Sequence, residues 1–131
     1  MTIDELRLLI DSIYLNYSVS DNPEITLEAN PDDLSKQKLN DLTTSRINRL
    51  SIGIQSFFED DLQSMNRAHS SQEAKQCLEE ATKHFSNITI DLIYGIPNMS
   101  IEKWNKNLQT AFSFGVNHIS SYALTVEPKT A

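Results

Sequence analysis

The sequence predicts an α/β fold in which four parallel strands alternate with helices. Short strand-like apolar runs take turns with segments whose apolar residues recur at the helical period. Strands joined by helical crossovers lie parallel in one sheet, and the connections are right-handed by default. The length of 131 residues fits one domain or part of one.

The first elements follow from capping and breaking residues. Thr2 and Glu5 stand at capping-box spacing and open an amphipathic helix over 2–17. A strand over 24–30 comes next. Pro31 and the two acidic residues after it are expected to start a second helix, because both residue types suit a first turn. The apolar stripe of the first helix comprises Ile3, Leu6, Ile10, Ile13, Tyr14 and Tyr17.

The middle of the chain predicts a strand at about 47–55 and a short helix at about 58–65. Ser70 and Glu73 form a second capping box and open a helix over about 70–84.

The last part of the chain predicts a strand over 88–94, a helix that begins at Ser100, and a final strand over 119–126. The apolar face expected on that helix comprises Ile101, Trp104, Leu108 and Phe112. Trp104, Phe112 and Phe114 are expected in the core.

The strands have two different faces. Alternation alone fits an open doubly wound sheet or a piece of a (β/α) barrel. Strands covered by helices on both sides are nearly continuous apolar runs, whereas these alternate. A barrel with a roomy, polar interior therefore fits better. The small or polar face is expected to carry Thr26, Glu28, Asn30, Ser51, Gly53, Gln55, Thr89, Asp91, Ile93, Ser121, Ala123 and Thr125.

Glu28, Gln55, Asp91 and Arg67 are the candidate binding residues. The first three point into one space near the carboxyl ends of the strands, where parallel α/β sheets bind ligands. A guanidinium binds a carboxylate in two-pronged fashion, while carboxylates and amides accept from ammonium and hydroxyl groups. The set suits a zwitterionic amino-acid-nucleoside ligand. The alternative is that these residues bind no ligand. Glu28 and Asp91 would then be strand-end carboxylates paired with lysines, and Arg67 would be a solvated residue at a helix end.

Composition narrows the function classes. A net charge of −7 argues against a nucleic-acid partner. The start of the chain is no signal peptide, and no apolar run could span a membrane, so a cytoplasmic protein is expected. Cys77 is the one cysteine, expected to be buried and inert, so no metal site is predicted. His69 is expected to be a capping or exposed loop residue.

Several segments together resemble the coproporphyrinogen III oxidase-like radical SAM proteins. They are "EITLEANP" (24–31), "INRLSIGIQSF" (47–57), "NRAHS" (66–70), "ITIDLIYGIP" (88–97) and "HISSYALTVEP" (118–128). The resemblance covers nearly the whole chain. It implies a partial, TIM-like (β/α)6 barrel that binds S-adenosylmethionine (SAM) and a [4Fe–4S] cluster. By motif, it implies that the SAM contacts are Glu28, Gln55, Arg67, Asp91 and Ala123.

The chain also departs from that family. The family's C-x-x-x-C-x-x-C cluster loop and its glycine-rich G-G-G-T-P segment are both missing. We therefore expect residues 1–131 to be a fragment of the radical SAM core domain, roughly strands three to six, inactive by itself.

The resemblance leaves two functions open. One branch of the family, the oxygen-independent oxidases, decarboxylates coproporphyrinogen III by a radical route in porphyrin biosynthesis. The other branch, the HemW-like haem chaperones, binds and delivers haem. "EANP", "RAHS" and "LTVEP" are closer to the chaperone branch. An unrelated ligand-binding α/β domain is the third possibility.

The strand over 24–30 is expected to be an edge of the sheet. Unpaired backbone groups on an edge strand attract other chains. We therefore expect a homodimer joined through this edge. The alternative is a monomer whose N-terminal helix shifts to cover it.

Overall fold

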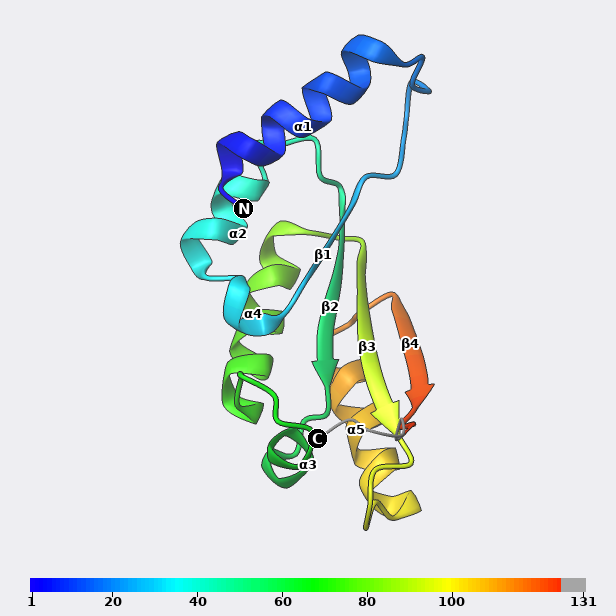
Figure 1. Ribbon diagram of the computed structural model, residues 1–131. Coiled ribbons are helices and arrows are strands. Elements are labelled where there is room, and N and C mark those ends of the chain that lie inside the picture. The colour runs from blue at the N-terminus through cyan, green and yellow to red at the C-terminus, as the bar shows by residue number, and fades with distance from the viewer. Residues whose placement is uncertain (126–131) are drawn as a thin grey trace.

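The computed structural model describes residues 1–125 and confirms the α/β fold with four parallel strands. Helices and strands alternate along the chain as predicted (Figure 1). The helical elements are α1 (Ile3–Asn16), η1 (Pro31–Asp33), α2 (Lys36–Leu42), α3 (Glu59–Ser64), α4 (Ser71–His84) and α5 (Ile101–Ser113). The strands are β1 (Thr26–Ala29), β2 (Arg49–Gln55), β3 (Ile88–Tyr94) and β4 (His118–Ala123).

The sheet has the order β1-β2-β3-β4, with every neighbouring pair parallel. Strands that are consecutive in sequence are therefore neighbours in the sheet. All four strands point in the same direction, toward the side of the molecule where α3 follows β2 (Figure 1). Strand β1 is one edge of the sheet in the described part of the chain, as the sequence predicts.

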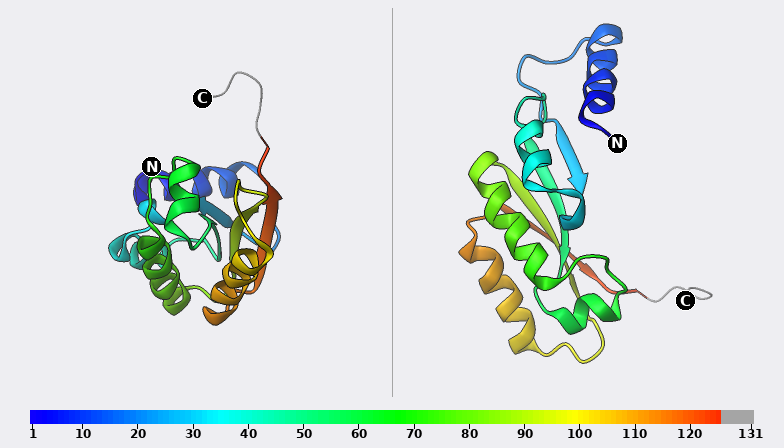
Figure 2. Two further views of the ribbon diagram at one scale, coloured as in Figure 1. Left: turned by 90° about the horizontal axis from the view of Figure 1, so that it is seen from below. Right: turned by 90° about the vertical axis from the view of Figure 1, so that its left-hand side faces the viewer.

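One face of the sheet is covered by helices and holds the core. Helices α2, α4 and α5 lie on the same side of the strands (Figure 2). Leucine and isoleucine side chains fill the space between these layers, because alternate residues of β2 and β3 point toward the helices. The fully buried members with the largest side chains include Leu39, Leu42, Leu50, Ile52, Ile54, Leu78, Ile88, Ile90 and Leu92.

The segment after β1 differs from the prediction. Pro31 does not begin α2 but opens η1, a separate 3₁₀ turn. Helix α2 begins later, because Ser35 is its N-cap and its hydroxyl accepts from the Lys38 backbone N–H at 3.2 Å. A second local cap thus competes with the proline for the start of the helix.

Two predicted apolar stripes are only partly buried. In α1, Leu6 and Ile10 are buried, while Ile13 and Tyr17 are exposed. In α5, Ile101 and Phe112 of the predicted face are exposed. Trp104, Leu108 and Phe114 pack partly buried against the core, as expected, around the buried Asn107 and Ala111. The face of α5 that packs on the core is therefore rotated relative to the predicted face, and Asn107 and Ala111 lie at its centre.

The predicted small face of β4 is wrong. Asp91 pairs with Ser120 and Ile93 with Tyr122, so Ser120 and Tyr122 lie on the inner face. Ser121 and Ala123 pair with Leu92 and Tyr94, on the helix-covered side of the sheet. The regular strand ends at Ala123, and the predicted end of this strand, Val126, lies outside the described residues.

No helix within residues 1–125 is long and apolar enough to cross a membrane.

Candidate functional site

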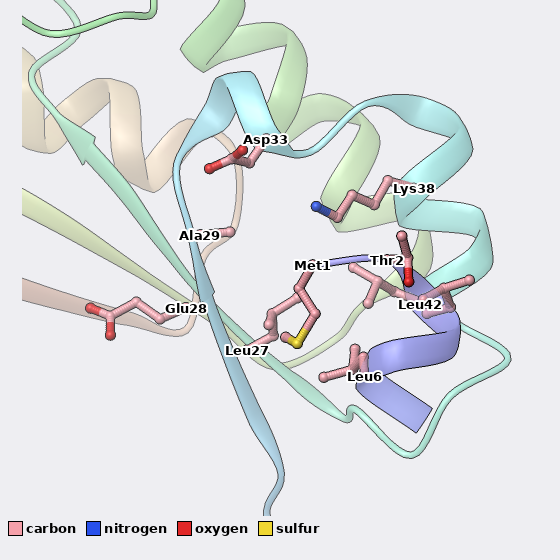
Figure 3. Close-up of a pocket in the computed structure, with 10 residues that line it drawn as sticks. Met1, Thr2, Leu6, Leu27, Glu28, Ala29, Asp33, Lys38 and Leu42 are labelled. Atoms are coloured by element: carbon pink, nitrogen blue, oxygen red, sulfur yellow. The ribbon is translucent and has the colours of Figure 1, made fainter. Parts of the chain in front are cut away.

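The inner face of the sheet is polar, in contrast to the helix-covered face. Strand alternation and register place Glu28 of β1, Ser51 and Gly53 of β2, Asp91 of β3 and Ser120 of β4 on this side. Figure 3 shows the alternation directly. Glu28 borders a mainly apolar cavity whose lining includes Leu6, Leu27 and Leu42, but its carboxylate points to the opposite side of β1 from those side chains.

The amino-terminal end of the inner face is closed by its own hydrogen bonds. The Arg49 guanidinium donates to Thr89 Oγ1 at 2.5 Å and to Glu24 Oε1 at 3.1 Å. Thr89 Oγ1 lies 3.2 Å from His118 Nδ1. These polar groups therefore satisfy one another's hydrogen-bonding capacity across the strands. Groups nearer the carboxyl ends of the strands are therefore the ones placed to meet a ligand.

Glu28 and Asp91 are the carboxylates of this face that lie nearer the carboxyl ends of the strands. Burial raises the pKa of Asp91 above its ordinary value, the nearby Ser120 hydroxyl opposes that shift, and the charge of Glu28 adds to it. The two carboxylates are thus close enough to interact. No lysine forms an ion pair with either of them within residues 1–125.

Gln55 ends β2 in a strained backbone conformation. Its φ is +66°, a left-handed value that is uncommon for residues other than glycine. The backbone N–H of Ser56 donates to the carbonyl of Ile54 at 2.8 Å, which closes a three-residue γ-turn around Gln55. The pairing of β2 with β3 is irregular at the same place. Strain of this kind concentrates at ligand sites.

The Gln55 amide and the Arg67 guanidinium meet above Gly53. A Cβ atom added to Gly53 would lie 2.8 Å from Gln55 Nε2, 3.1 Å from Asn30 Oδ1 and 3.5 Å from Arg67 Nη2. Only a glycine leaves room for these three polar groups to converge. We call Asn30, Gln55 and Arg67 the polar cradle.

Arg67 is held in the cradle by Asn30. Its Nη2 donates to Asn30 Oδ1 at 3.2 Å. Arg67 is half-buried rather than a freely solvated helix end. The Gln55 side chain forms no hydrogen bond with another residue in the described part of the chain. Its amide is therefore available to a ligand.

The structure brings four of the five predicted contact residues to the inner side. Gln55 and Arg67 share the cradle, and Glu28 and Asp91 share the space below it. Ala123 is different, because its register with Tyr94 directs its side chain to the other face. The backbone of Ala123 lies at the carboxyl end of β4.

Asn30 and Gly53 are site residues that sequence reasoning did not single out. Both had a signal. Asn30 follows a strand directly, and a glycine inside a strand marks a close approach of another group. Neither signal identifies what approaches.

The prediction for His69 is wrong. This side chain is buried, and its Nε2 lies 3.1 Å from the carbonyl oxygen of Ile54. Its Nδ1 lies 3.8 Å from Asp32 Oδ1. His69 therefore links the end of β2 to the loop after β1.

Cys77 is buried, as predicted, and burial raises the pKa of its thiol to about 12. No three His, Cys, Asp or Glu side chains gather as metal ligands within residues 1–125. The residues of this chain therefore do not fit an iron–sulfur cluster by themselves.

Comparison with known proteins identifies the family of this chain. The family described as the Radical SAM superfamily matches residues 2–111. "Heme chaperone HemW" of Bacillus subtilis (strain 168) is 40% identical over 130 residues, which cover 97% of this chain and 34% of that protein. "Heme chaperone HemW" of Escherichia coli (strain K12) is 34% identical over 95% of this chain and 33% of its own length.

A solved structure shares the fold. It is described as "Coproporphyrinogen III oxidase (HemN) from Escherichia coli is a Radical SAM enzyme". It superposes with a TM-score of 0.85 at 24% identity, over 98% of this chain and 30% of that chain. The four-stranded sheet is thus part of a TIM-like barrel fold.

These matches define the class of protein first: an α/β chain whose sequence matches a radical SAM family model and whose sheet shares the fold of a radical SAM protein. The chain belongs to the Radical SAM superfamily, and its relatives include the haem chaperones named HemW. It spans about a third of the length of the curated relatives that it matches.

Proposed function

We propose that this chain forms the SAM-binding wall of a longer radical SAM protein of haem or porphyrin metabolism. Glu28, Gln55, Arg67, Asp91 and Ala123 are the proposed SAM contacts. The observation that supports this most strongly is the polar cradle, which converges above Gly53 next to two inner-face carboxylates. Family membership supplies the identity of the ligand.

The chemistry of these groups fits SAM. Among residues 1–125 the Arg67 guanidinium donates one N–H group, to Asn30, and its other N–H groups are proposed to bind the carboxylate of the ligand. Glu28 and Asp91 are acceptors for an ammonium group or for ribose hydroxyls. Gln55 can both donate and accept. The absence of a side chain at Gly53 keeps the space between these groups open.

The [4Fe–4S] cluster of radical SAM proteins needs thiolates from elsewhere. Such clusters are held by cysteines, and this chain contains one, which is buried with a raised pKa. We propose that the chain is a fragment of the core domain, roughly strands three to six of the barrel, and that another part of a longer protein supplies the cluster loop. A cytoplasmic setting, with reduced thiols, is part of this proposal.

Of the two branches, we favour the haem chaperones. Relatives that carry this name match over nearly the whole chain at 31–40% identity, and "EANP" and "RAHS" agree with that branch. The second candidate is an oxidase that decarboxylates coproporphyrinogen III. It is supported by the fold shared with such an enzyme.

The test uses a full-length protein that carries this segment, prepared anaerobically. Titration calorimetry measures SAM binding, and absorption spectroscopy measures haem binding. Decarboxylation of coproporphyrinogen III is assayed in parallel. We expect SAM binding together with haem binding and no decarboxylation. Turnover of coproporphyrinogen III would support the oxidase instead, and a protein that does not bind SAM would refute both.

A further inference from the structure

A buried polar network lies directly behind the strained end of β2. Ser56 Oγ donates to Asp61 Oδ2 at 2.7 Å, and Asn107 Nδ2 donates to Ser56 Oγ at 3.2 Å. Lys103 Nζ donates to Asp61 Oδ1 at 2.5 Å. Ser56, Asp61 and Asn107 are almost completely buried, and the Lys103 side chain is 17% exposed. We call these four residues the turn network.

The turn network joins segments that are far apart in sequence. Ser56 and Asp61 belong to the turn after β2 and to α3, while Lys103 and Asn107 belong to α5. Asn107 also accepts from the Phe57 backbone N–H at 2.8 Å. The network therefore fixes the backbone of the two residues that directly follow Gln55.

The residue before Gln55 is fixed as well. The carbonyl of Ile54 accepts from the Ser56 backbone N–H at 2.8 Å and from His69 Nε2 at 3.1 Å. The carbonyl oxygen can only accept, so Nε2 of the buried His69 carries a hydrogen here. Gln55 thus lies between two anchored neighbours.

We propose that the turn network is a positioning device for the candidate SAM site. It holds Gln55 in its left-handed conformation, so that the amide folds back over Gly53 beside Arg67. Without the network, residue 55 would relax to an extended φ and its side chain would leave the cradle. This role rests on the proposed function only for the identity of the ligand.

Two physical arguments support the assignment. A strained conformation persists only where the surrounding structure over-determines it, and the contacts on both sides of Gln55 do so. A buried ion pair is also weak evidence for stability, because desolvation of the charges offsets their attraction. A pair such as Asp61–Lys103 is better explained by fixing one arrangement of the turn.

The first experiment compares the effect of Gln55→Gly on stability in two backgrounds of this chain. The midpoint of urea denaturation is the quantity measured. If Gln55 is strained, Gln55→Gly raises the midpoint, because glycine tolerates positive φ. In an Asp61→Asn/Lys103→Met background the turn relaxes, and the same change lowers the midpoint because glycine adds unfolded-state entropy. An equal shift in both backgrounds would overturn the proposal. Asn107→Ala provides a second background should the double variant unfold.

The second experiment measures SAM affinity by calorimetry in a full-length protein that carries this segment. Asp61→Asn/Lys103→Met is expected to weaken binding about tenfold, the loss that corresponds to one well-formed hydrogen bond. The matched control is Lys83→Met, which breaks the exposed Lys83–Glu80 pair on α4. Unchanged affinity in the double variant would refute the positioning role.

The two experiments separate this proposal from the proposed function. If the unmodified protein does not bind SAM, the proposed function fails. The change in sign of the Gln55→Gly shift in urea midpoint between the two backgrounds still decides whether the network enforces the turn. If SAM binds and the reversal is absent, the network is only structural.

Discussion

Arg67 donates from Nη2 to Asn30 Oδ1 at 3.2 Å, a contact between residues 37 positions apart. It ties the loop after α3 to the end of β1. The guanidinium is thereby held beside the Gln55 amide, at the carboxyl edge of the sheet. The polar cradle depends on this contact, so substitutions in and beside the cradle are the most direct tests of the proposed SAM site.

Arg67→Ala is expected to weaken SAM binding in a full-length protein that carries this segment. If the guanidinium pairs with the ligand carboxylate, the loss should be about 2–5 kcal/mol, as for truncation of one member of a buried charged pair. Arg67→Lys should also weaken binding, because an ammonium group cannot form the two-pronged contact. Titration calorimetry measures both effects.

The control for Arg67 is Arg46→Ala. Arg46 pairs with Asp11 and covers the Tyr14 ring, far from the inner face. Its loss should leave SAM affinity unchanged. Equal affinities for Arg67→Ala and Arg46→Ala would remove Arg67 from the site.

Gly53→Ala is expected to disturb binding more than stability. The added Cβ would lie 2.8 Å from Gln55 Nε2, the far end of a flexible side chain, which can move away. We expect the free energy of unfolding to change by less than about 1 kcal/mol. SAM affinity should fall about tenfold, because the displaced amide loses its contact. A variant that binds SAM normally would show that the convergence above Gly53 is not used.

Asp91→Asn is expected to stabilise this chain at neutral pH. Burial raises the pKa of Asp91, so the folded state binds this proton more readily than the unfolded chain. The charged carboxylate therefore destabilises the fold at pH 7, and stability from this group increases as pH falls through its raised pKa. The gain from Asp91→Asn should fade below the ordinary value of 3.8.

Urea denaturation at several pH values checks the effect of Asp91→Asn. The exposed Asp21→Asn variant is the control and should show no such pH-dependent gain. Destabilisation by Asp91→Asn at pH 7 would mean that the charge is favourable in the folded state.

The isolated chain is expected to form no iron–sulfur cluster. Cluster ligation takes several cysteine thiolates, and Cys77 is the one cysteine of the sequence. After anaerobic reconstitution with iron and sulfide, and desalting, no cluster absorption should remain. A stoichiometric and stable [4Fe–4S] spectrum would contradict this expectation.

Self-association through β1 remains a prediction. Strand β1 is an edge of the sheet, and edges with unpaired backbone groups recruit other chains. Sedimentation equilibrium at micromolar concentration should show a dimer. Thr26→Lys, at an exposed position of β1, should dissociate it, since lysines on an edge oppose pairing.

Ser121→Lys on β4, the opposite edge of the described sheet, is the matched control and should leave the dimer intact. Loss of the dimer only in Ser121→Lys would assign the association to β4. A monomer in the unmodified chain would show that the β1 edge tolerates water.

Much of the fold could be predicted from local signals. The capping boxes at Thr2 and Ser70 correctly predicted the starts of α1 and α4. The strand predicted over 88–94 coincides with β3. Such signals are local, since a cap bonds within one turn and strand alternation needs no partner. The start of α2 was wrong because two local signals, Pro31 and Ser35, compete.

The site was predictable in part. Family resemblance and strand ends singled out Gln55 and Arg67, and the structure brings both together. The left-handed φ of Gln55, the burial of His69 and the role of Gly53 were not predictable, because each depends on groups from other elements. The inner side of β4 was misassigned for a related reason. A one-residue difference in register exchanges the two faces of a strand.

The sequence by itself determined the parallel α/β alternation, the apolar side of β2 and β3, and the residue types available for a ligand. These properties follow from side-chain period and from bonds within a few residues. Tertiary structure alone decided that Asn107 of α5, 51 positions from Ser56, fixes the turn that presents Gln55. Contacts over such separations depend on how helices dock on the sheet, and no local pattern encodes that choice.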